Sequence, residues 1–292
     1  MLRWCGEQGF RLALVETDEG RAQLASVERQ RARHKPTENL DAWDCYQRGL
    51  WHLYRYSIQD YGKAVGLFER AVDLDPIFAS AQAGLAFTLY YGIVLGFTED
   101  HDDNVARGFE AGRTAVMLDD DDPFAHVALG RMHTIRTEHD ETIAACDRAI
   151  SLNPSYANAH FGRAHSLWMS GRPGEAIASH DEAIRLSPRD PMMWAFMASK
   201  AIALILLERY DEALTWTRKG QQRADLPIWA HMPEVSALGL LGRIEEASTA
   251  LDRVRQLKPD VSLDFVDQVL KFTNAIDREH FVDGLRKAGL EM

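Results

Sequence analysis

The chain repeats itself with a period of 34 residues between positions 119 and 188. Two consecutive segments align there without a gap, so that Leu129-Gly130 matches Arg163-Ala164 and Pro154 matches Pro188. A fixed period of this length, with small residues at constant offsets and a closing proline, is typical of antiparallel helix pairs stacked into a solenoid. The sequence therefore predicts an all-α fold in which each helix pair packs on the next.

The offsets resemble those of the tetratricopeptide repeat, or TPR. That family places small residues at positions 8, 20 and 27 of the repeat and often a proline at position 32. The segment 157–190 follows this pattern with Ala164, Ala176, Ala183 and Pro188. Two helices approach closely only where side chains are small, and proline disfavours helix in the residue before it. The resemblance implies a right-handed superhelical solenoid of helix-turn-helix repeats with a C-terminal helical cap.

The register divides the chain into three parts. Residues 1–40 form an N-terminal segment that is expected to be partly helical and is basic near 29–35, residues 41–260 hold about six TPR-like repeats, and residues 262–292 form capping helices. The repeats are expected at approximately 43–78, 79–122, 123–156, 157–190, 191–227 and 228–261. The second repeat is longer than the others, with its extra residues between 90 and 104.

Composition excludes several classes of protein. The chain is 46% hydrophobic and 26% charged, which is typical of a globular protein. Its net charge of −11 argues against nucleic-acid binding, although the basic stretch 29–35 leaves a local patch open beside the simpler interpretation of a solvated helix end. Three widely spaced cysteines suggest neither a disulfide framework nor a zinc site. No apolar stretch is long enough to span a bilayer, so we expect a cytoplasmic protein without membrane association.

A wider resemblance covers roughly residues 28–292. The order of several stretches is similar to the C-terminal TPR region of a bacterial group of signalling proteins; these stretches lie at 35–36, 40–43, 46–49, 67–76 and 284–290. In that group the repeats follow either a class III adenylate/guanylate cyclase domain or a winged-helix DNA-binding domain. The chain offers no strand pattern for a cyclase and only about 40 residues before the first repeat. We therefore expect the repeat half of such a protein, either standing alone or starting at a displaced initiation site.

In TPR proteins the first helix of each repeat lines the concave face, so the resemblance also implies a candidate partner-binding groove. The side chains expected there are mostly aromatic, with one arginine and one histidine, a composition found at energetically important interfaces. They are Phe87, Tyr90, Tyr91, Phe124, Val127, Arg131, Phe161, His165, Trp168 and Trp229. The alternative interpretation is that several of them pack against neighbouring helices.

Motifs that carry chemistry are missing from the sequence. It contains no GxSxG, GxxxxGK[ST], GxGxxG or HExxH, and the acidic run 119–122 lacks the spacing of a calcium loop. We expect no catalytic residue, no cofactor and no metal. The predicted function is a non-enzymatic module that binds a peptide or partner protein in the concave groove, in bacterial signalling or regulation; homo-oligomerisation stays open. The alternatives are a regulatory or oligomerising fragment of an adenylate cyclase or transcriptional regulator whose effector domain is missing or separately encoded, and an enzyme with an unrecognised site.

Overall fold

The computed structural model describes residues 41–98, 100–221 and 226–291. Within these ranges every regular element is a helix, so the predicted all-α class is confirmed. The chain divides into two compact units, one up to Met132 and one from His133 onward. We call them unit 1 and unit 2, and each is described by itself. The predicted basic segment 29–35 and Cys5 lie outside the described residues.

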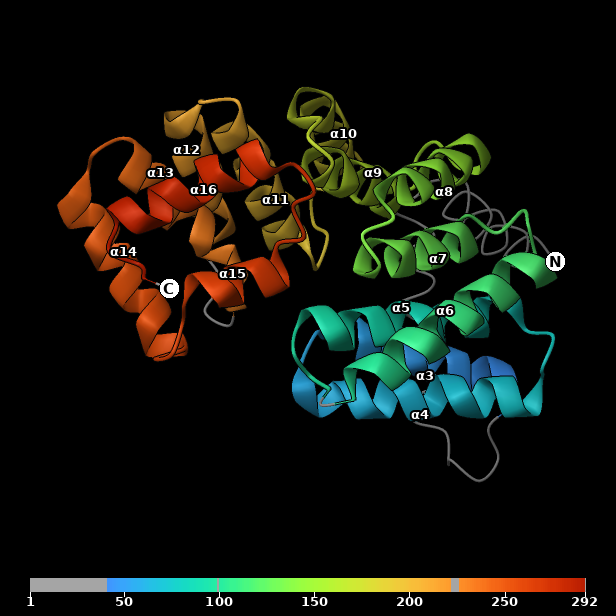
Figure 1. The fold of residues 1–292 in the computed structure, drawn as a ribbon. Coiled ribbons are helices and arrows are strands. Elements are labelled where there is room, and N and C mark those ends of the chain that lie inside the picture. Colours follow the sequence, from blue (N-terminus) through green and yellow to red (C-terminus); the bar gives the residue numbers. More distant parts are fainter. Residues whose placement is uncertain (1–40, 99, 222–225, 292) are drawn as a thin grey trace, which may run out of the picture. The chain divides into compact units, whose positions relative to one another are not determined.

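The helices follow one another in pairs. Unit 1 contains α3 (Ala42–Leu53), α4 (Ile58–Leu74), α5 (Ala79–Val94), α6 (His101–Leu118) and most of α7 (Pro123–Ile135). Unit 2 continues with α8 (His139–Leu152), α9 (Ala157–Met169), α10 (Pro173–Leu186), α11 (Met193–Leu206), α12 (Tyr210–Gly220), the 3₁₀ turn η2 (Ile228–Ala230), α13 (Met232–Leu240), α14 (Ile244–Leu257), α15 (Leu263–Val269) and α16 (Ala275–Lys287). Figure 1 shows this succession of antiparallel neighbours within each unit.

The turn inside each helix pair uses the same backbone device. In each pair a residue two or three positions beyond the end of the first helix adopts a positive φ, which reverses the direction of the chain. Glycine fills this position in three pairs and a residue with a side chain fills it in the other three; the six are Gly96, Gly171, Gly242, Tyr56, Thr137 and Glu208. Side chains disfavour this conformation by roughly 1 kcal/mol, so half of the turns carry local strain.

We expect Glu208→Gly to stabilise unit 2 by roughly 0.5–1 kcal/mol, because Glu208 is exposed and holds φ at 60°. The reciprocal change Gly242→Ala places a side chain at φ 70° in open space and should cost a similar amount. Urea unfolding of the two variants measures both effects. A Glu208→Gly variant that is less stable than the wild type would contradict the strain argument.

Unit 1 is built around the ring of Phe68 on α4. The ring is fully buried and lies against Gly49 on α3 and Gly84 on α5. A Cβ atom at Gly49 would come within 2.8 Å of the ring, and one at Gly84 would overlap it more severely. Glycine on both first helices thus lets one phenylalanine join the first pair to the second.

The additional residues of the second repeat lie in longer helices. Helix α5 has 16 residues and α6 has 18, whereas α9 and α10 have 13 and 14. Few residues remain for the connection between them, from Leu95 to Asp100. The sequence located the extra length correctly but did not indicate that it is helical.

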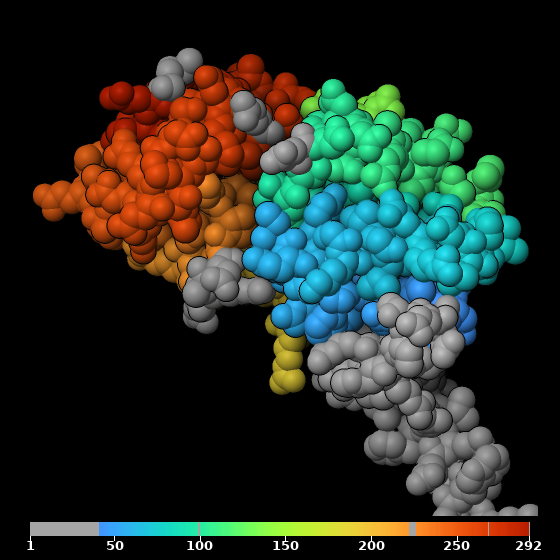
Figure 2. All heavy atoms as spheres, turned by 90° about the horizontal axis from the view of Figure 1, so that it is seen from below, coloured from blue at the N-terminus to red at the C-terminus, as the bar shows by residue number. Residues whose placement is uncertain are grey.

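In unit 2 each helix from α8 to α14 contacts the next, and the first helix α11 also contacts the first helices α9 and α13 on either side of it. We call the side on which these three helices meet the first-helix face of unit 2. Helix α16 folds back onto this face and contacts α11 and α13 (Figure 1). In the space-filling view the orange and red atoms of the C-terminal helices gather in one area of the surface of unit 2 (Figure 2).

Small residues allow α16 to lie close to α13. Gly239 on α13 faces Gly284 on α16, and a Cβ atom on either would overlap backbone atoms of the other helix. The hydroxyl of Ser236 donates a hydrogen bond of 2.7 Å to the carbonyl oxygen of Phe281. Phe281 and Leu285 are fully buried in this contact, so α16 is part of the core of unit 2.

Candidate interaction surfaces

In unit 1 the structure brings the predicted groove residues of α5 and α7 together. The ring centroid of Phe87 lies 5.0 Å from that of Tyr91 and 5.5 Å from that of Phe124, in edge-to-face geometry. The guanidinium of Arg131 lies 5.6 Å from the ring of Tyr90, a cation–π distance. Only Phe124 keeps substantial exposure, since Phe87 is 1% exposed and Arg131 also 1%. Val127 is fully buried beside them.

In unit 2 the predicted residues of α9 form a second cluster. Phe161 stacks on Phe196 of α11 with ring centroids 4.4 Å apart, and it is 4% exposed. Trp168 is fully buried, and His165 is 9% exposed with its ring 5.1 Å from that of Trp168. These side chains stabilise the contact between α9 and α11, as the alternative interpretation of the sequence expected for several groove residues.

A single hydroxyl connects the polar atoms of this cluster. Ser199 on α11 accepts a hydrogen bond of 2.8 Å from Nε1 of Trp168. Its Oγ also lies 3.0 Å from Nδ1 of His165 and 3.3 Å from Nε2 of His180. A hydroxyl donates one hydrogen bond and accepts two, so one histidine donates to Ser199 and the other accepts from it. The cluster is a buried polar network, and Ser199 is fully shielded from solvent.

Trp229, the last predicted groove residue, lies in unit 2 and makes its ring contact outside the α9 cluster. It belongs to η2 and pairs with Trp194 of α11 at a centroid distance of 5.1 Å. Trp229 is 8% exposed, and its indole Nε1 has no hydrogen-bond partner among the described residues. The contacts place this tryptophan at the start of the last helix pair.

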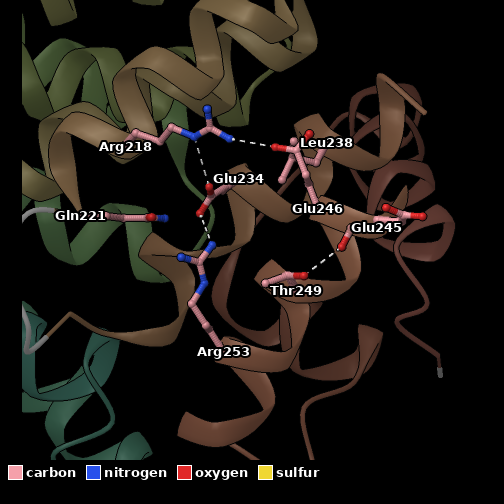
Figure 3. Close-up of a pocket in the computed structure, with 8 residues that line it drawn as sticks. All are labelled: Arg218, Gln221, Glu234, Leu238, Glu245, Glu246, Thr249 and Arg253. Atoms are coloured by element: carbon pink, nitrogen blue, oxygen red, sulfur yellow. Dashed lines mark hydrogen bonds and ion pairs between the residues drawn. The ribbon is translucent and has the colours of Figure 1, made fainter. Parts of the chain in front are cut away.

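A hollow of the described surface lies between α12, α13 and α14 (Figure 3). It encloses about 610 Å³, and the carboxylate of Glu234 lies at its centre. Nε of Arg218 donates to this carboxylate at 3.4 Å, and Nη2 of Arg253 donates to it at 3.0 Å. Glu234 is 5% exposed, while both arginine side chains are half exposed. These two ion pairs connect α12 of one helix pair with α13 and α14 of the next across the hollow.

Replacing this central carboxylate should weaken the junction of the last two helix pairs. We expect Glu234→Ala to lower the free energy of unfolding by about 1–3 kcal/mol, because two charge-assisted hydrogen bonds are lost while both guanidiniums stay accessible to water. Chemical denaturation measures the loss. Glu245→Ala, which removes a carboxylate from the rim of the same hollow, is the matched control. An equal loss in both variants would contradict the role of Glu234.

A smaller hollow of about 320 Å³ opens in unit 2 at the turns after α7 and α9. Its lining combines carboxylates, a guanidinium and hydroxyls; the residues are Thr137, Glu138, His139, Asp140, Glu141, Ser170, Arg172 and Thr273. Three carboxylates against one guanidinium give the hollow an acidic character. His139 is 4% exposed, and burial lowers the pKa of its imidazole below the usual value of 6.5.

Acidification should destabilise unit 2 through this histidine. The unfolded chain takes up a proton on His139 near pH 6.5, whereas the folded protein does so only at lower pH. The unfolded state therefore binds more protons below pH 6.5, and stability is lost as the pH falls through this window. His139→Gln keeps a hydrogen-bond donor and removes the titration. Urea unfolding at pH 7.5 and 5.5 should show a smaller loss for this variant than for the wild type, and an equal loss would contradict the prediction.

Two findings complete the geometry. Among the described residues no helix combines the length and the apolarity that crossing a membrane requires. Over the same residues no group of histidine, cysteine, aspartate or glutamate side chains is arranged to hold a metal ion.

Comparison with known proteins identifies the repeats. The family profile described as "Tetratricopeptide repeat" matches residues 136–191 and 161–225, which cover the helix pairs α7–α8 to α11–α12 in part or in full. The chain contains tetratricopeptide repeats. The resemblance seen in the offsets of the sequence is thereby confirmed.

Solved TPR structures share the fold. A thermophilic TPR protein of Thermus thermophilus is 22% identical, with a TM-score of 0.53 over 68% of this chain and 98% of that one. The pilF protein of Pseudomonas aeruginosa is 16% identical, with a TM-score of 0.54 over 80% and 95%. The APC/C hetero-tetramer Cut9–Hcn1 contains a chain that is 15% identical, with a TM-score of 0.65 over 91% of this chain and 46% of that one. At these identities the likeness concerns the fold.

Curated relatives match at the level of sequence. The transcriptional regulator HilA of Salmonella typhimurium is 25% identical over 215 residues, which cover 72% of this chain, and HilA of Salmonella typhi matches to the same extent. This chain spans 37% of the length of these relatives.

The predicted groove residues do not line either of the two hollows in unit 2. Cys146 and His180, which stand 34 residues apart, are both fully buried. Glu234 was missed because it occupies a position where the family pattern expects no charge pair. Phe272, which contacts Trp168, follows the last repeat, so no position in the repeat pattern identifies it. The signal that could have found it is its place between a short apolar stretch and Asn274, the N-cap of α16.

Proposed function

We propose that this chain is a non-enzymatic interaction module that binds a peptide or partner protein on the face formed by the first helices of its repeats. The TPR fold suggests a protein–protein interaction scaffold, and this is the observation that carries the proposal. The aromatic clusters around Phe87 in unit 1 and Phe161 in unit 2 support the choice of face. Both clusters lie on first helices, and although most of their rings are buried, the partly exposed ring of Phe124 on α7 offers an aromatic contact to a partner.

The partner belongs to a bacterial signalling or regulatory system in the cytoplasm. Support comes from the relatives HilA of two Salmonella species, which are named transcriptional regulators. Among the fold neighbours, the chain in the APC/C hetero-tetramer Cut9–Hcn1 belongs to an assembly of more than one protein. The composition of the chain, with a net charge of −11, favours protein or peptide partners over nucleic acid.

A second candidate function is that of the regulatory or oligomerising part of a longer regulator. The match to HilA favours it, because this chain corresponds to 37% of the length of that regulator. In this case the effector domain would be separately encoded or missing from this chain. Activity of such an effector measured with and without this protein separates the two candidates.

Selection of binding peptides tests the first candidate. A displayed library of random peptides is selected on the intact protein, and hydrogen exchange with mass spectrometry then maps the protected helices. Protection of α5 and α7, or of α9 and α11, is the expected result. Protection confined to the second helices α10, α12 and α14, or no enrichment of any peptide, would contradict the proposal.

A further inference from the structure

The connection between α15 and α16 lies at the α9 end of the first-helix face of unit 2 as an extended segment of chain. We call residues 270–274 the strap. Its two ends have extended backbone angles, with φ −97° and ψ 98° at Leu270 and φ −89° and ψ 113° at Asn274. The strap lies against the end of α9 and the start of α8, two helix ends that are far from the strap in the sequence.

The strap is held by its main chain. The N–H of Thr273 donates to the carbonyl oxygen of Met169 at 3.0 Å, and the hydroxyl of Thr273 donates to the same oxygen at 3.1 Å. Nε2 of His139 donates to the carbonyl oxygen of Lys271 at 3.2 Å. Met169 is the last residue of α9, and the terminal carbonyls of a helix lack partners within it. The face thus offers one acceptor and one donor to an extended chain.

One aromatic side chain supplies the apolar contact. The ring of Phe272 meets the edge of Trp168 at a centroid distance of 5.2 Å and lies 5.7 Å from Phe281. It covers the tryptophan that the sequence assigned to the partner-binding groove. Asn274 lies directly against Gly171, where a Cβ atom would come within 2.6 Å of its amide nitrogen. Main-chain pairing plus one aromatic anchor is how an extended peptide is recognised.

The helices on both sides of the strap are anchored by contacts of their own. On the C-terminal side α16 is fixed by Phe281, Val282 and Leu285, all fully buried. On the other side, Leu263 and Val266 anchor α15. The strap itself is held by the three hydrogen bonds described above, the buried side chain of Leu270 and one partly buried aromatic ring. Opening it costs much less than removing α16 from the core.

From these contacts we infer that the strap is an intramolecular ligand, and that unit 2 binds an extended peptide segment of a partner with an aromatic side chain in its place. This inference rests on the proposed function and names the chemistry of its partner. The partner segment carries an aromatic side chain for Trp168, followed by threonine or serine for the carbonyl of Met169. The main-chain carbonyl before the aromatic residue accepts from His139, as that of Lys271 does in the strap.

A tethered segment competes with a free one at a high effective concentration. For a short connection this concentration is in the millimolar range, so an untethered peptide binds the closed protein weakly. If the strap is closed in about 90–99% of molecules, weakening it raises the apparent affinity of the peptide about 10- to 100-fold. The quantity to measure is therefore the ratio of the peptide's affinity for a protein with a weakened strap to its affinity for the wild type.

The test uses the intact chain and a labelled peptide with the sequence of residues 269–276, Val-Leu-Lys-Phe-Thr-Asn-Ala-Ile. Fluorescence anisotropy compares its binding to the wild type, to Phe272→Ala and to Ile276→Ala, a neighbouring change at a side chain that is 80% exposed. We expect Phe272→Ala to bind at least 10-fold more tightly than the other two. The peptide with alanine in place of phenylalanine should not bind.

Equal affinity of the peptide for all three proteins would overturn the inference, as would equal binding of the peptide without its phenylalanine. Circular dichroism shows whether Phe272→Ala folds. If it does not, Thr273→Val removes only the hydroxyl bond to Met169 and should raise the affinity several-fold. A concentration-dependent dimer that disappears in the strap variants would assign the strap to a second copy and overturn its intramolecular role.

The library selection keeps the two proposals distinguishable. Peptides that bind the wild type and Phe272→Ala alike would support the interaction function and overturn the strap alone. Enrichment of aromatic peptides on Phe272→Ala in preference to the wild type would support both. Failure of every peptide on both proteins would overturn both.

Discussion

The Trp168→Ala variant is expected to lose about 3–5 kcal/mol of unfolding free energy, the usual cost of removing a large aromatic ring from a core. The ring is fully buried, and its Nε1 donates to Ser199, which also contacts two histidines. Its removal leaves a cavity between α9 and α11 and takes away the surface on which Phe272 rests. Urea unfolding followed by circular dichroism measures the loss.

Trp43→Ala is the matched control, because the ring of Trp43 is 48% exposed and stacks only at the edge of unit 1. It should cost about 1 kcal/mol. A loss for Trp168→Ala no greater than for Trp43→Ala would contradict the buried position of Trp168. The same reasoning applies to Phe161, which is 4% exposed. Alanine at both positions would unfold unit 2 before it could report on a partner, so binding is better tested through the strap.

The Gly239→Ala variant should release α16 from α13. A Cβ atom at this position overlaps the carbonyl oxygen of Gly284, a backbone atom that cannot move without its helix. We expect a loss of about 3 kcal/mol or more, at the upper end of the cost of overpacking. Faster hydrogen exchange throughout α16 identifies the helix that moves.

Gly174→Ala provides the comparison for this variant. Gly174 lies in the first turn of α10, and an added Cβ atom there meets nothing within 4 Å. Because alanine favours the helix, this change should be neutral or stabilise unit 2 by up to about 1 kcal/mol. Equal destabilisation by the two substitutions would show that α16 does not depend on the glycine contact.

The helix pairs could be predicted from the sequence because the period fixes them. Small residues recur every 34 residues at the repeat positions that Ala164 and Ala183 occupy, and both of these side chains are fully buried. The turns were harder to predict, since Tyr56, Thr137 and Glu208 occupy the positive-φ position that glycine usually marks. The last pair also departs from the pattern: its first helix begins at Met232 after a 3₁₀ turn, because Pro233 is tolerated only in the first turn of a helix.

The binding groove stays a prediction. Phe87, Tyr91 and Phe124 contact one another in the structure, but position in the repeat carries no information on how deeply each ring is buried. Burial in unit 2 depends on contacts made by Phe272 and α16, which lie beyond the last repeat and follow no period. Such long-range packing is decided by shape, through pairs such as Gly239 and Gly284, and not by spacing.

The amide hydrogen exchange of Thr273, measured by NMR in the free protein and in the presence of a saturating selected peptide, tests the central claim most directly. In the free protein this N–H is bonded to Met169 and should be protected. With peptide bound, it should exchange at least 10-fold faster while the amide of Leu285 in α16 stays protected, because only the strap is displaced. Unchanged protection of Thr273 in a protein saturated with peptide would contradict the account.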